Sequence, residues 1–152
     1  MEMNLTSVVL VEDENGGWKE YKRLHGDENR IWVGISRVPK NLQNAFIAIE
    51  DETFYEHKGV NWRRTLGAIG NDVFKFDETE FGGSTITQQL IKNVSGKNDI
   101  SVKRKIQEIL WALDLERKMD KNAILENYLN VINLSQGCYG VGAAADVYYS
   151  KK

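Results

Sequence analysis

Two adjacent glycines, followed by a run of hydroxyl and amide side chains, constrain this chain more than any other feature. The run reads Gly82-Gly83-Ser84-Thr85-Ile86-Thr87-Gln88-Gln89, and Lys92 follows one helical turn later. Glycine permits a sharp turn and a close approach of the backbone to another group. A hydroxyl at Thr85 and an amide three residues later at Gln88 fit the capping box that starts a helix. The sequence therefore predicts a tight loop that leads into a helix from about residue 84.

The start of that helix is also a candidate binding site. The first N–H groups of a helix have no partner within the helix and attract anions. Lys92 shares a helix face with Gln88 and Gln89, because residues three and four apart are neighbours on a helix. We therefore expect this face to hold a polar or charged ligand. A capped helix with an ordinary exposed polar side is the alternative at this point.

The rest of the pattern predicts a mostly helical domain with a small β hairpin or sheet at the N-terminus. Apolar residues recur at helical spacing in four further segments: residues 39–51, residues 61–74, residues 102–119 and the segment that Asp120 can cap. The helix of residues 102–119 is apolar almost all round, which is typical of a buried helix. Short β-prone runs occupy residues 8–11, 18–24 and 31–35, with a turn signal at residues 15–17. We expect one domain over residues 1–152, with a β-rich part at 1–37 and a helical part at 38–152.

Composition excludes several other classes of protein. A chain of 152 residues with 41% hydrophobic residues and four tryptophans can form a core, which argues against disorder. The net charge of −2 gives no sign of a nucleic-acid partner. Cys138 is the single cysteine, so no disulfide can form within the chain. No apolar run approaches the about twenty residues that a membrane-spanning helix needs.

Acidic residues stand out at two places. Glu50, Asp51 and Glu52 come at the end of the helix of residues 39–51, where negative charge opposes the helix dipole and so suggests a role other than stability. The alternative is a solvated acidic helix end. Glu108 follows Arg104 by four residues, so the two side chains share a helix face. The alternative for this pair is a surface ion pair of little consequence.

Four short motifs carry a family resemblance. They read Glu-Asp-x-x-Phe-x-x-His-x-Gly at residues 50–59, Gly-x-Ser-Thr-Ile-Thr-Gln-Gln at 82–89, Arg-Lys-x-x-Glu at 104–108 and Lys-x-x-Ile-Leu-Glu-x-Tyr-Leu-Asn at 121–130. Their order and spacing resemble those of the peptidoglycan glycosyltransferase (transglycosylase) domain of class A penicillin-binding proteins and monofunctional transglycosylases. The resemblance covers roughly residues 30 to 149 and implies a lysozyme-like helical fold.

The resemblance also implies a reaction and a set of site residues. The reaction is polymerisation of a polyprenyl-pyrophosphate-linked disaccharide peptide (lipid II) into β-1,4 glycan strands, by inverting transfer with release of polyprenyl pyrophosphate. Such a transfer needs a base for the acceptor hydroxyl and cations for the leaving pyrophosphate. The resemblance places the general base at Glu50 and the second catalytic carboxylate at Glu108. The implied substrate-binding residues are Asp51, Ser84, Thr85, Gln88, Gln89, Lys92, Arg104 and Lys105.

We expect different tasks for different residues of this set. We expect Ser84, Thr85 and Gln88 mainly to shape the loop, whereas Lys92 and Arg104 contact pyrophosphate oxygens. His57 can titrate near neutrality, yet we favour a structural role for its ring. No cofactor is required, although a divalent cation such as Mg²⁺ or Mn²⁺ can help to offset the pyrophosphate charge.

The substrate class implies work at a membrane surface. The resemblance places the enzyme on the extracytoplasmic face of the bacterial cytoplasmic membrane, with the growing glycan strand as second substrate. Residues 60–76, which include Trp62 and Leu66, are the candidate segment for membrane contact, and an amphipathic core helix is the alternative. The resemblance further implies a domain truncated at both ends, with an export signal and membrane anchor before Met1 and a transpeptidase domain as an optional neighbour in the parent protein.

Two alternative functions remain open at this point. One is a lysozyme-like glycan hydrolase or lytic transglycosylase, which has no need of a cationic site for pyrophosphate. The other is a truncated, non-catalytic domain that binds the lipid precursor. Ile100, which stands where relatives often carry a basic residue, and the C-terminal stretch of the family's donor site, expected beyond Lys152, favour the second. Gly142 stands where relatives usually carry Glu, which also bears on activity.

Overall fold

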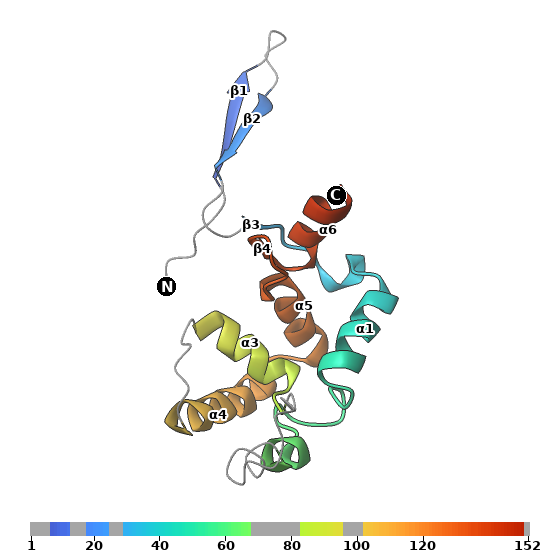
Figure 1. Ribbon diagram of the computed structural model, residues 1–152, viewed down its shortest axis with the longest axis vertical. Coiled ribbons are helices and arrows are strands. Elements are labelled where there is room, and N and C mark those ends of the chain that lie inside the picture. Colours follow the sequence, from blue (N-terminus) through green and yellow to red (C-terminus); the bar gives the residue numbers. More distant parts are fainter. Residues whose placement is uncertain (1–6, 13–17, 25–28, 68–82, 96–101, 151–152) are drawn as a thin grey trace. The chain divides into compact units, whose positions relative to one another are not determined.

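The computed structural model describes residues 7–12, 18–24, 29–67, 83–95 and 102–150, as Figure 1 shows. Contacts divide the chain into two units. One unit comprises Gly34–Leu129, and the other combines Met1–Val33 with Asn130–Lys152. Four expectations fall wholly or partly outside the described residues. They concern the turn at residues 15–17, the second half of the helix at 61–74, residues 75–82 of the loop expected at 75–83, and the departure at Ile100.

The first of these units, residues 34–129, is built from helices. They are the 3₁₀ turn η1 (Ile35–Arg37) and the α-helices α1 (Lys40–Glu50), α3 (Ile86–Ser95), α4 (Val102–Lys118) and α5 (Lys121–Val131, whose last residues belong to the other unit). A further helical stretch begins at Trp62 and is described as far as residue 67. The expectation of a mostly helical domain is confirmed. Within the described residues, no helix is both long and apolar enough to cross a bilayer.

Helix α5 supplies much of the core of this unit. Ile124, Leu125, Tyr128 and Leu129 are fully buried, which is the spacing of a single helix face. The expected cap is present, because the main-chain N–H of Ala123 donates to a carboxylate oxygen of Asp120 over 2.8 Å. Helix α5 is therefore a fixed wall against which the neighbouring segments pack.

The loop between α1 and Trp62 is seated on α4 and α5. Phe54 in this loop is fully buried, and the ammonium group of Lys121 lies 4.5 Å from the centre of its ring. Gly59 has φ = +93°, and a Cβ atom there would stand 2.7 Å from the carbonyl oxygen of Ala112. The loop thus reaches α4 so closely that only glycine fits at position 59.

The expectation that the helix of residues 102–119 is buried all round is wrong. Ile106 and Leu110 in α4 are 53% and 58% exposed. The buried face carries Glu108 and Ala112 instead, because α4 meets α3 and the Gly59 loop through a small residue and a paired carboxylate. The backbone at Gly59 approaches α4 so closely that only a small residue fits at the contact, and the larger side chains of Ile106 and Leu110 therefore lie on other faces of α4.

The second unit contains short strands and one helix. Strands β1 (Ser7–Glu12) and β2 (Trp18–Leu24) pair antiparallel, and β3 (Asn29–Arg30) pairs parallel with β4 (Cys138–Tyr139). Helix α6 (Val141–Tyr149) packs on β3 and β4. A Cβ atom on Gly142 would overlap the carbonyl oxygen of Ile31, so this close contact requires glycine at position 142.

The strand expected at residues 31–35 is absent, so that prediction is wrong. Residues 31–34 belong to no strand, and η1 begins at Ile35. The side-chain amide of Asn130 takes the place of a neighbouring strand: its Oδ1 accepts from the N–H of Val33 over 2.7 Å and its Nδ2 donates to the Val33 carbonyl over 2.8 Å. A distant side chain therefore satisfies the backbone groups that a sheet would have paired.

The seating of the Gly59 loop yields a stability prediction. Replacing Gly59→Ala should lower the free energy of unfolding by about 2–4 kcal/mol, because the strain of positive φ adds to an overlap with the Ala112 carbonyl. Gly67→Ala is the matched control, since a Cβ atom there meets nothing within 4 Å. Urea unfolding monitored by tryptophan fluorescence measures both variants. Equal stabilities would show that Gly59 does not hold the loop on α4.

Candidate active site

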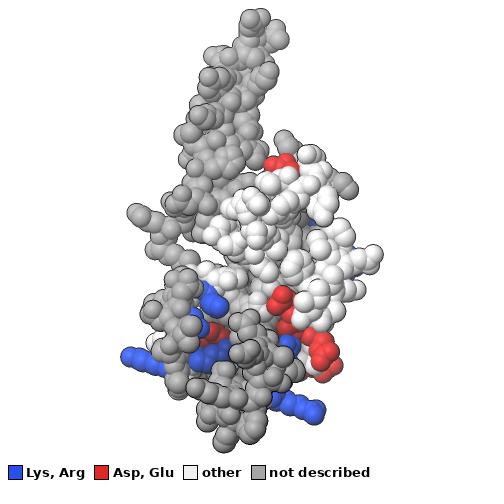
Figure 2. Space-filling model, viewed as in Figure 1, with Lys and Arg blue, Asp and Glu red and all other residues white. Residues whose placement is uncertain are grey.

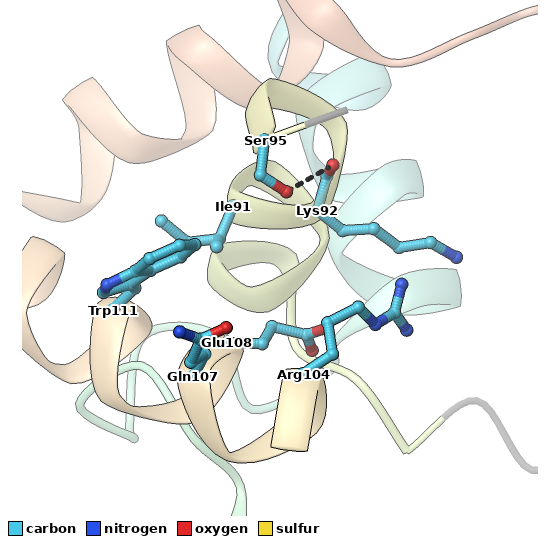
Figure 3. Close-up of a pocket in the computed structure, with 7 residues that line it drawn as sticks. All are labelled: Ile91, Lys92, Ser95, Arg104, Gln107, Glu108 and Trp111. Atoms are coloured by element: carbon cyan, nitrogen blue, oxygen red, sulfur yellow. Dashed lines mark hydrogen bonds between the residues drawn. The ribbon is translucent and has the colours of Figure 1, made fainter. Parts of the chain in front are cut away.

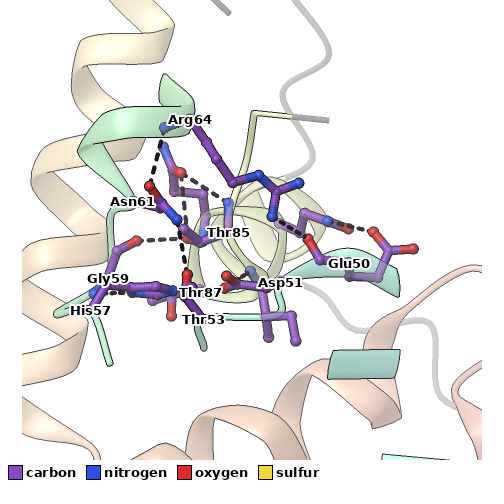
Figure 4. Close-up of polar contacts among 12 residues, drawn as sticks. Glu50, Asp51, Thr53, His57, Gly59, Asn61, Arg64, Thr85 and Thr87 are labelled. Carbon is purple, nitrogen blue, oxygen red and sulfur yellow. Dashed lines mark hydrogen bonds and ion pairs between the residues drawn. The ribbon is translucent and has the colours of Figure 1, made fainter. Parts of the chain in front are cut away.

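Glu50 is the last residue of α1, and its side chain is half-buried. Its Oε2 atom accepts a hydrogen bond of 2.8 Å from the side-chain amide of Gln89 in α3. Its Oε1 atom accepts no hydrogen bond from the described residues. Among the described residues, one carboxylate oxygen is thus held by the protein and the other has no hydrogen-bond donor, as the end of the network in Figure 4 shows.

The amide of Gln89 is itself held from the other side. The hydroxyl of Tyr128 in α5 donates to Gln89 Oε1 over 3.2 Å. Burial raises the pKa of Tyr128, and the negative charge of Glu50 raises it further, so the phenol stays protonated and remains a donor. The three side chains form one chain of hydrogen bonds directed toward Glu50.

Arg64 approaches the same end of α1 from the helical stretch that begins at Trp62. Its Nη1 atom donates to the main-chain carbonyl of Glu50 over 3.2 Å. A cation at a helix C-terminus is favourable, so it offsets the cost of placing Glu50 there. Asn61 positions this arginine, because its Oδ1 accepts from the Arg64 main-chain N–H over 3.1 Å while its Nδ2 donates to Thr53 Oγ1 over 2.8 Å (Figure 4).

Asp51 ties the end of α1 to the start of α3. Its side chain is fully buried, and its Oδ2 atom accepts from the main-chain N–H of Ile86 over 3.1 Å. The same oxygen lies 2.8 Å from Nε2 of His57, whose Nδ1 accepts from the main-chain N–H of Gly59 over 3.1 Å. A main-chain N–H can only donate, so the ring proton sits on Nε2 and points at Asp51. These contacts fit the structural role expected for His57.

The capping box expected at the start of α3 is confirmed. The main-chain N–H of Thr85 donates to Gln88 Oε1 over 3.0 Å, and the main-chain N–H of Gln88 donates to Thr85 Oγ1 over 3.2 Å. The Thr85 hydroxyl in turn donates to the carbonyl of Gly59 over 2.6 Å. The motif therefore fastens the helix start to the loop that follows α1.

The expectation that this helix start is open to an anionic ligand is wrong. Asp51 and Thr85 already accept the N–H groups of Ile86 and Gln88. Asp51, Thr85 and Gln88 are among the implied substrate-binding residues, and all three side chains are buried. The contacts of Thr85 and Gln88 fit the expectation that they mainly shape this loop. These buried side chains hold the start of α3 in place, and the carboxylate of Asp51 supplies the negative charge that a helix N-terminus favours.

The second carboxylate lies in a pocket between α3 and α4. Glu108 is only 6% exposed, and its Oε1 accepts from the ammonium of Lys105 over 2.7 Å. Lys105 also donates to Ser84 Oγ over 2.9 Å, so it joins α4 to the residue before the capping box. The pocket is lined by Ile91, Lys92, Ser95, Arg104, Gln107, Glu108 and Trp111. Figure 3 shows Lys92 and Arg104 extending on one side of it and Trp111 on the other.

The structure thus gathers most of the predicted site residues along α3. Gln89 contacts Glu50, and Lys92, three residues later on the same helix, lines the pocket of Glu108 and Arg104. In Figure 2, basic side chains gather over the part of the unit of residues 34–129 that α3 and α4 occupy in Figure 1, with acidic side chains beside them. Carboxylates with an adjacent group of cations suit transfer to or from an anionic leaving group.

Comparison with known proteins identifies the family. The family model described as Transglycosylase matches residues 17–152. The chain belongs to the transglycosylase family. It is 46% identical over 151 residues to penicillin-binding protein 1A of Clostridium perfringens (strain 13 / Type A), which covers 97% of this chain and 22% of that protein. It is 41% identical over 142 residues to penicillin-binding protein 1F of Bacillus subtilis (strain 168), covering 93% of this chain and 19% of that protein. The chain spans about a fifth of the length of these curated relatives.

The family match confirms the resemblance read from the four motifs and the expected class of enzyme, a glycosyltransferase. Two residues of this transglycosylase site were missed at the sequence level. Tyr128 stands in the motif of residues 121–130 but was given no role in the site, although a buried tyrosine hydroxyl needs a partner and so points to a polar neighbour. Arg64 lies within the candidate membrane segment 60–76 and was likewise given no role in the site.

The capping box of the transglycosylase domain can be tested by mutation. Thr85→Ala should lower the free energy of unfolding by about 1–3 kcal/mol, because both the Gln88 N–H and the buried Gly59 carbonyl lose a partner. Thr85→Ser keeps the hydroxyl and should recover most of that loss in urea unfolding. If the serine variant is as unstable as the alanine variant, methyl packing rather than hydrogen bonding holds the helix start.

The raised pKa of Tyr128 predicts a stability change at alkaline pH. The folded-state pKa lies above the unfolded value of about 10, so the contribution of Tyr128 is fully present below about pH 10 and is lost as the pH rises toward the folded-state pKa. Unfolding free energies measured across this range should therefore fall less steeply for Tyr128→Phe. Glu50→Gln should lower the pKa of Tyr128, observed as tyrosinate absorbance, without removing the effect of burial. An unchanged titration in Glu50→Gln would contradict the influence of the Glu50 charge on the pKa of Tyr128.

Proposed function

We propose that this domain polymerises the polyprenyl-pyrophosphate-linked disaccharide peptide (lipid II) into β-1,4 glycan strands by inverting transfer. The observation that carries the proposal is the half-buried carboxylate of Glu50, with one oxygen held by Gln89 and the other without a hydrogen bond from any described residue. A base must lie within hydrogen-bond reach of the proton that it removes, which an open, oriented carboxylate oxygen satisfies. Glu50 is accordingly the general base.

In the proposed reaction, Glu50 takes the proton of the acceptor sugar hydroxyl as that oxygen attacks the anomeric carbon of the donor. The bond from this carbon to the pyrophosphate oxygen breaks, and its electron pair leaves with the polyprenyl pyrophosphate. Lys92 and Arg104 at the α3–α4 pocket neutralise the charge that develops there. Glu108 fixes Lys105 beside this pocket, so the second carboxylate serves the cationic end of the site.

The pocket also bears on the alternatives. A glycan hydrolase must protonate a leaving alcohol and has no pyrophosphate to bind. Two cations that extend into one pocket, with a carboxylate at its wall, fit an anionic leaving group better. A domain that only binds the precursor would have no use for the oriented base at Glu50.

Membrane contact belongs to the same proposal. Trp62 and Leu66 are 53% and 64% exposed and lie one helical turn apart, which suits insertion into a membrane surface. Residues 68–76 of the candidate segment 60–76 lie outside the described residues. We further propose the extracytoplasmic face of the bacterial cytoplasmic membrane as the location, a lysozyme-like helical domain as the fold, and a transpeptidase domain in the parent protein.

A divalent cation is an optional part of the proposal. The described residues contain no group of three His, Cys, Asp or Glu side chains suited to a metal ion. A cation such as Mg²⁺ would add positive charge at the pyrophosphate, beside Lys92 and Arg104.

Substitution of the base tests the proposed function. With lipid-linked precursor, the chain should form glycan strands that are resolved by length on a gel, and Glu50→Gln should lower the rate by at least about a hundredfold. Glu52→Gln is the matched control, because Glu52 belongs to the same acidic triplet but is exposed and makes no side-chain contact among the described residues. Its rate should match that of the unmodified chain.

Other results would identify a different function. A normal rate for Glu50→Gln would refute the assignment of the base. Cleavage of preformed glycan would indicate the hydrolase, and binding of the precursor without any product would indicate the non-catalytic domain.

A further inference from the structure

We propose that Tyr128 is a positioning residue for the general base, acting on Glu50 through the side-chain amide of Gln89. The inference rests on the proposed function, because it assigns a task within that reaction. Its basis is the continuous chain of contacts from the Tyr128 hydroxyl to Gln89 Oε1 and from Gln89 Nε2 to Glu50 Oε2, over 3.2 Å and 2.8 Å.

The direction of these two hydrogen bonds matters because a glutamine amide can be placed in either of two orientations. An amide can present either its NH₂ group or its carbonyl oxygen to a neighbour, with almost the same shape. With NH₂ toward Glu50 it donates to the carboxylate, whereas the reversed amide would set an oxygen against an anion. A hydroxyl that donates to the amide oxygen from the opposite side favours the first arrangement. Tyr128 therefore helps to select the orientation that keeps Glu50 charged and in place.

Tyr128 is suited to act only through another residue. Its side chain is fully buried, and its ring makes an edge contact with Phe46 at a centroid distance of 6.2 Å. Substrate has no access to its hydroxyl, which contacts Gln89. The phenol is also a constant donor, because burial and the charge of Glu50 raise its pKa.

Correct orientation of the base matters because a reacting group displaced by a fraction of an ångström loses much of its effect. Glu50 terminates α1, so its side chain depends on neighbours for its direction. Gln89 supplies the contact, and Tyr128, on the buried helix α5, anchors Gln89 in the core. The base is thereby connected to a rigid part of the unit.

The test is the kinetic effect of Tyr128→Phe, which removes the hydroxyl and keeps the ring. We expect kcat to fall about tenfold with little change in KM, because orientation of the base affects the chemical step. The acid limb of the pH–rate profile should move to higher pH, because the Glu50 anion loses part of the support for its charged form. A purely structural loss that lowers only the fraction of active enzyme would also lower the apparent kcat at unchanged KM, but it would leave the pH profile in place.

A double-mutant cycle shows whether Tyr128 acts through Gln89. Gln89→Met removes the amide, so adding Tyr128→Phe in that background should cause no further fall in kcat. If the two substitutions multiply their effects, Tyr128 acts by another route and the inference is overturned. If Tyr128→Phe does not fold, Gln89→Met alone must lower kcat and move the acid limb, and an unchanged profile again overturns the inference.

Tyr148→Phe is the matched control. It deletes the same group from a tyrosine whose hydroxyl donates to the main-chain carbonyl of Leu134 over 2.9 Å, so its kinetics should equal those of the unmodified chain. An inactive Glu50→Gln together with a Tyr128→Phe of unchanged kcat and pH profile would overturn this inference alone. An active Glu50→Gln would instead remove the proposed function on which the inference rests.

Discussion

The carboxylate of Asp51, buried at the start of α3, is the contact on which the site depends. It accepts from the main-chain N–H of Ile86 and from the ring N–H of His57, so it joins the end of α1 to the start of α3 and to the Gly59 loop. A negative charge is favourable at a helix N-terminus, which helps to compensate for its burial. Because Glu50 precedes Asp51 and Gln89 follows Ile86 by three residues, this anchor also sets the two functional side chains beside each other.

The polar residues of the four motifs are of two kinds: some line the candidate site, and others form hydrogen bonds to main-chain groups of distant segments. Asn130 pairs with both backbone groups of Val33, and Glu126 accepts from the main-chain N–H of Ile35 over 2.8 Å. Thr85 and Gln88 cap α3 from within the core. Such residues are polar because they replace secondary-structure partners, and a buried backbone group without a partner would be costly. Polarity within a motif is thus poor evidence for ligand contact.

How much the sequence could predict follows from the range of each interaction. The span of α1, the cap of α5 and the capping box at Thr85 depend on neighbours within four residues, and all were predictable. The strand expected at 31–35 failed because the partner of Val33 lies 97 residues away. The prediction that α4 is buried all round failed because the face that packs inward is set by the close approach of Gly59 and not by hydrophobicity. Local patterns therefore gave the elements and the motif residues, while long-range contacts decided which side chains reach the surface.

The two carboxylates have different surroundings, and this difference argues for different tasks. Among the described residues, Glu50 has one oxygen without a hydrogen bond and accepts at the other from a neutral amide, an arrangement that suits a group that receives a proton. Glu108 is nearly buried and paired with Lys105, so its charge is already committed to a cation. Helix α3 contributes a residue near each carboxylate: Gln89 contacts Glu50, and Lys92, one turn later, lines the pocket of Glu108. An inverting transfer needs this separation of roles, because a base must stay free at the acceptor while the opposite end of the site stays cationic for the leaving pyrophosphate.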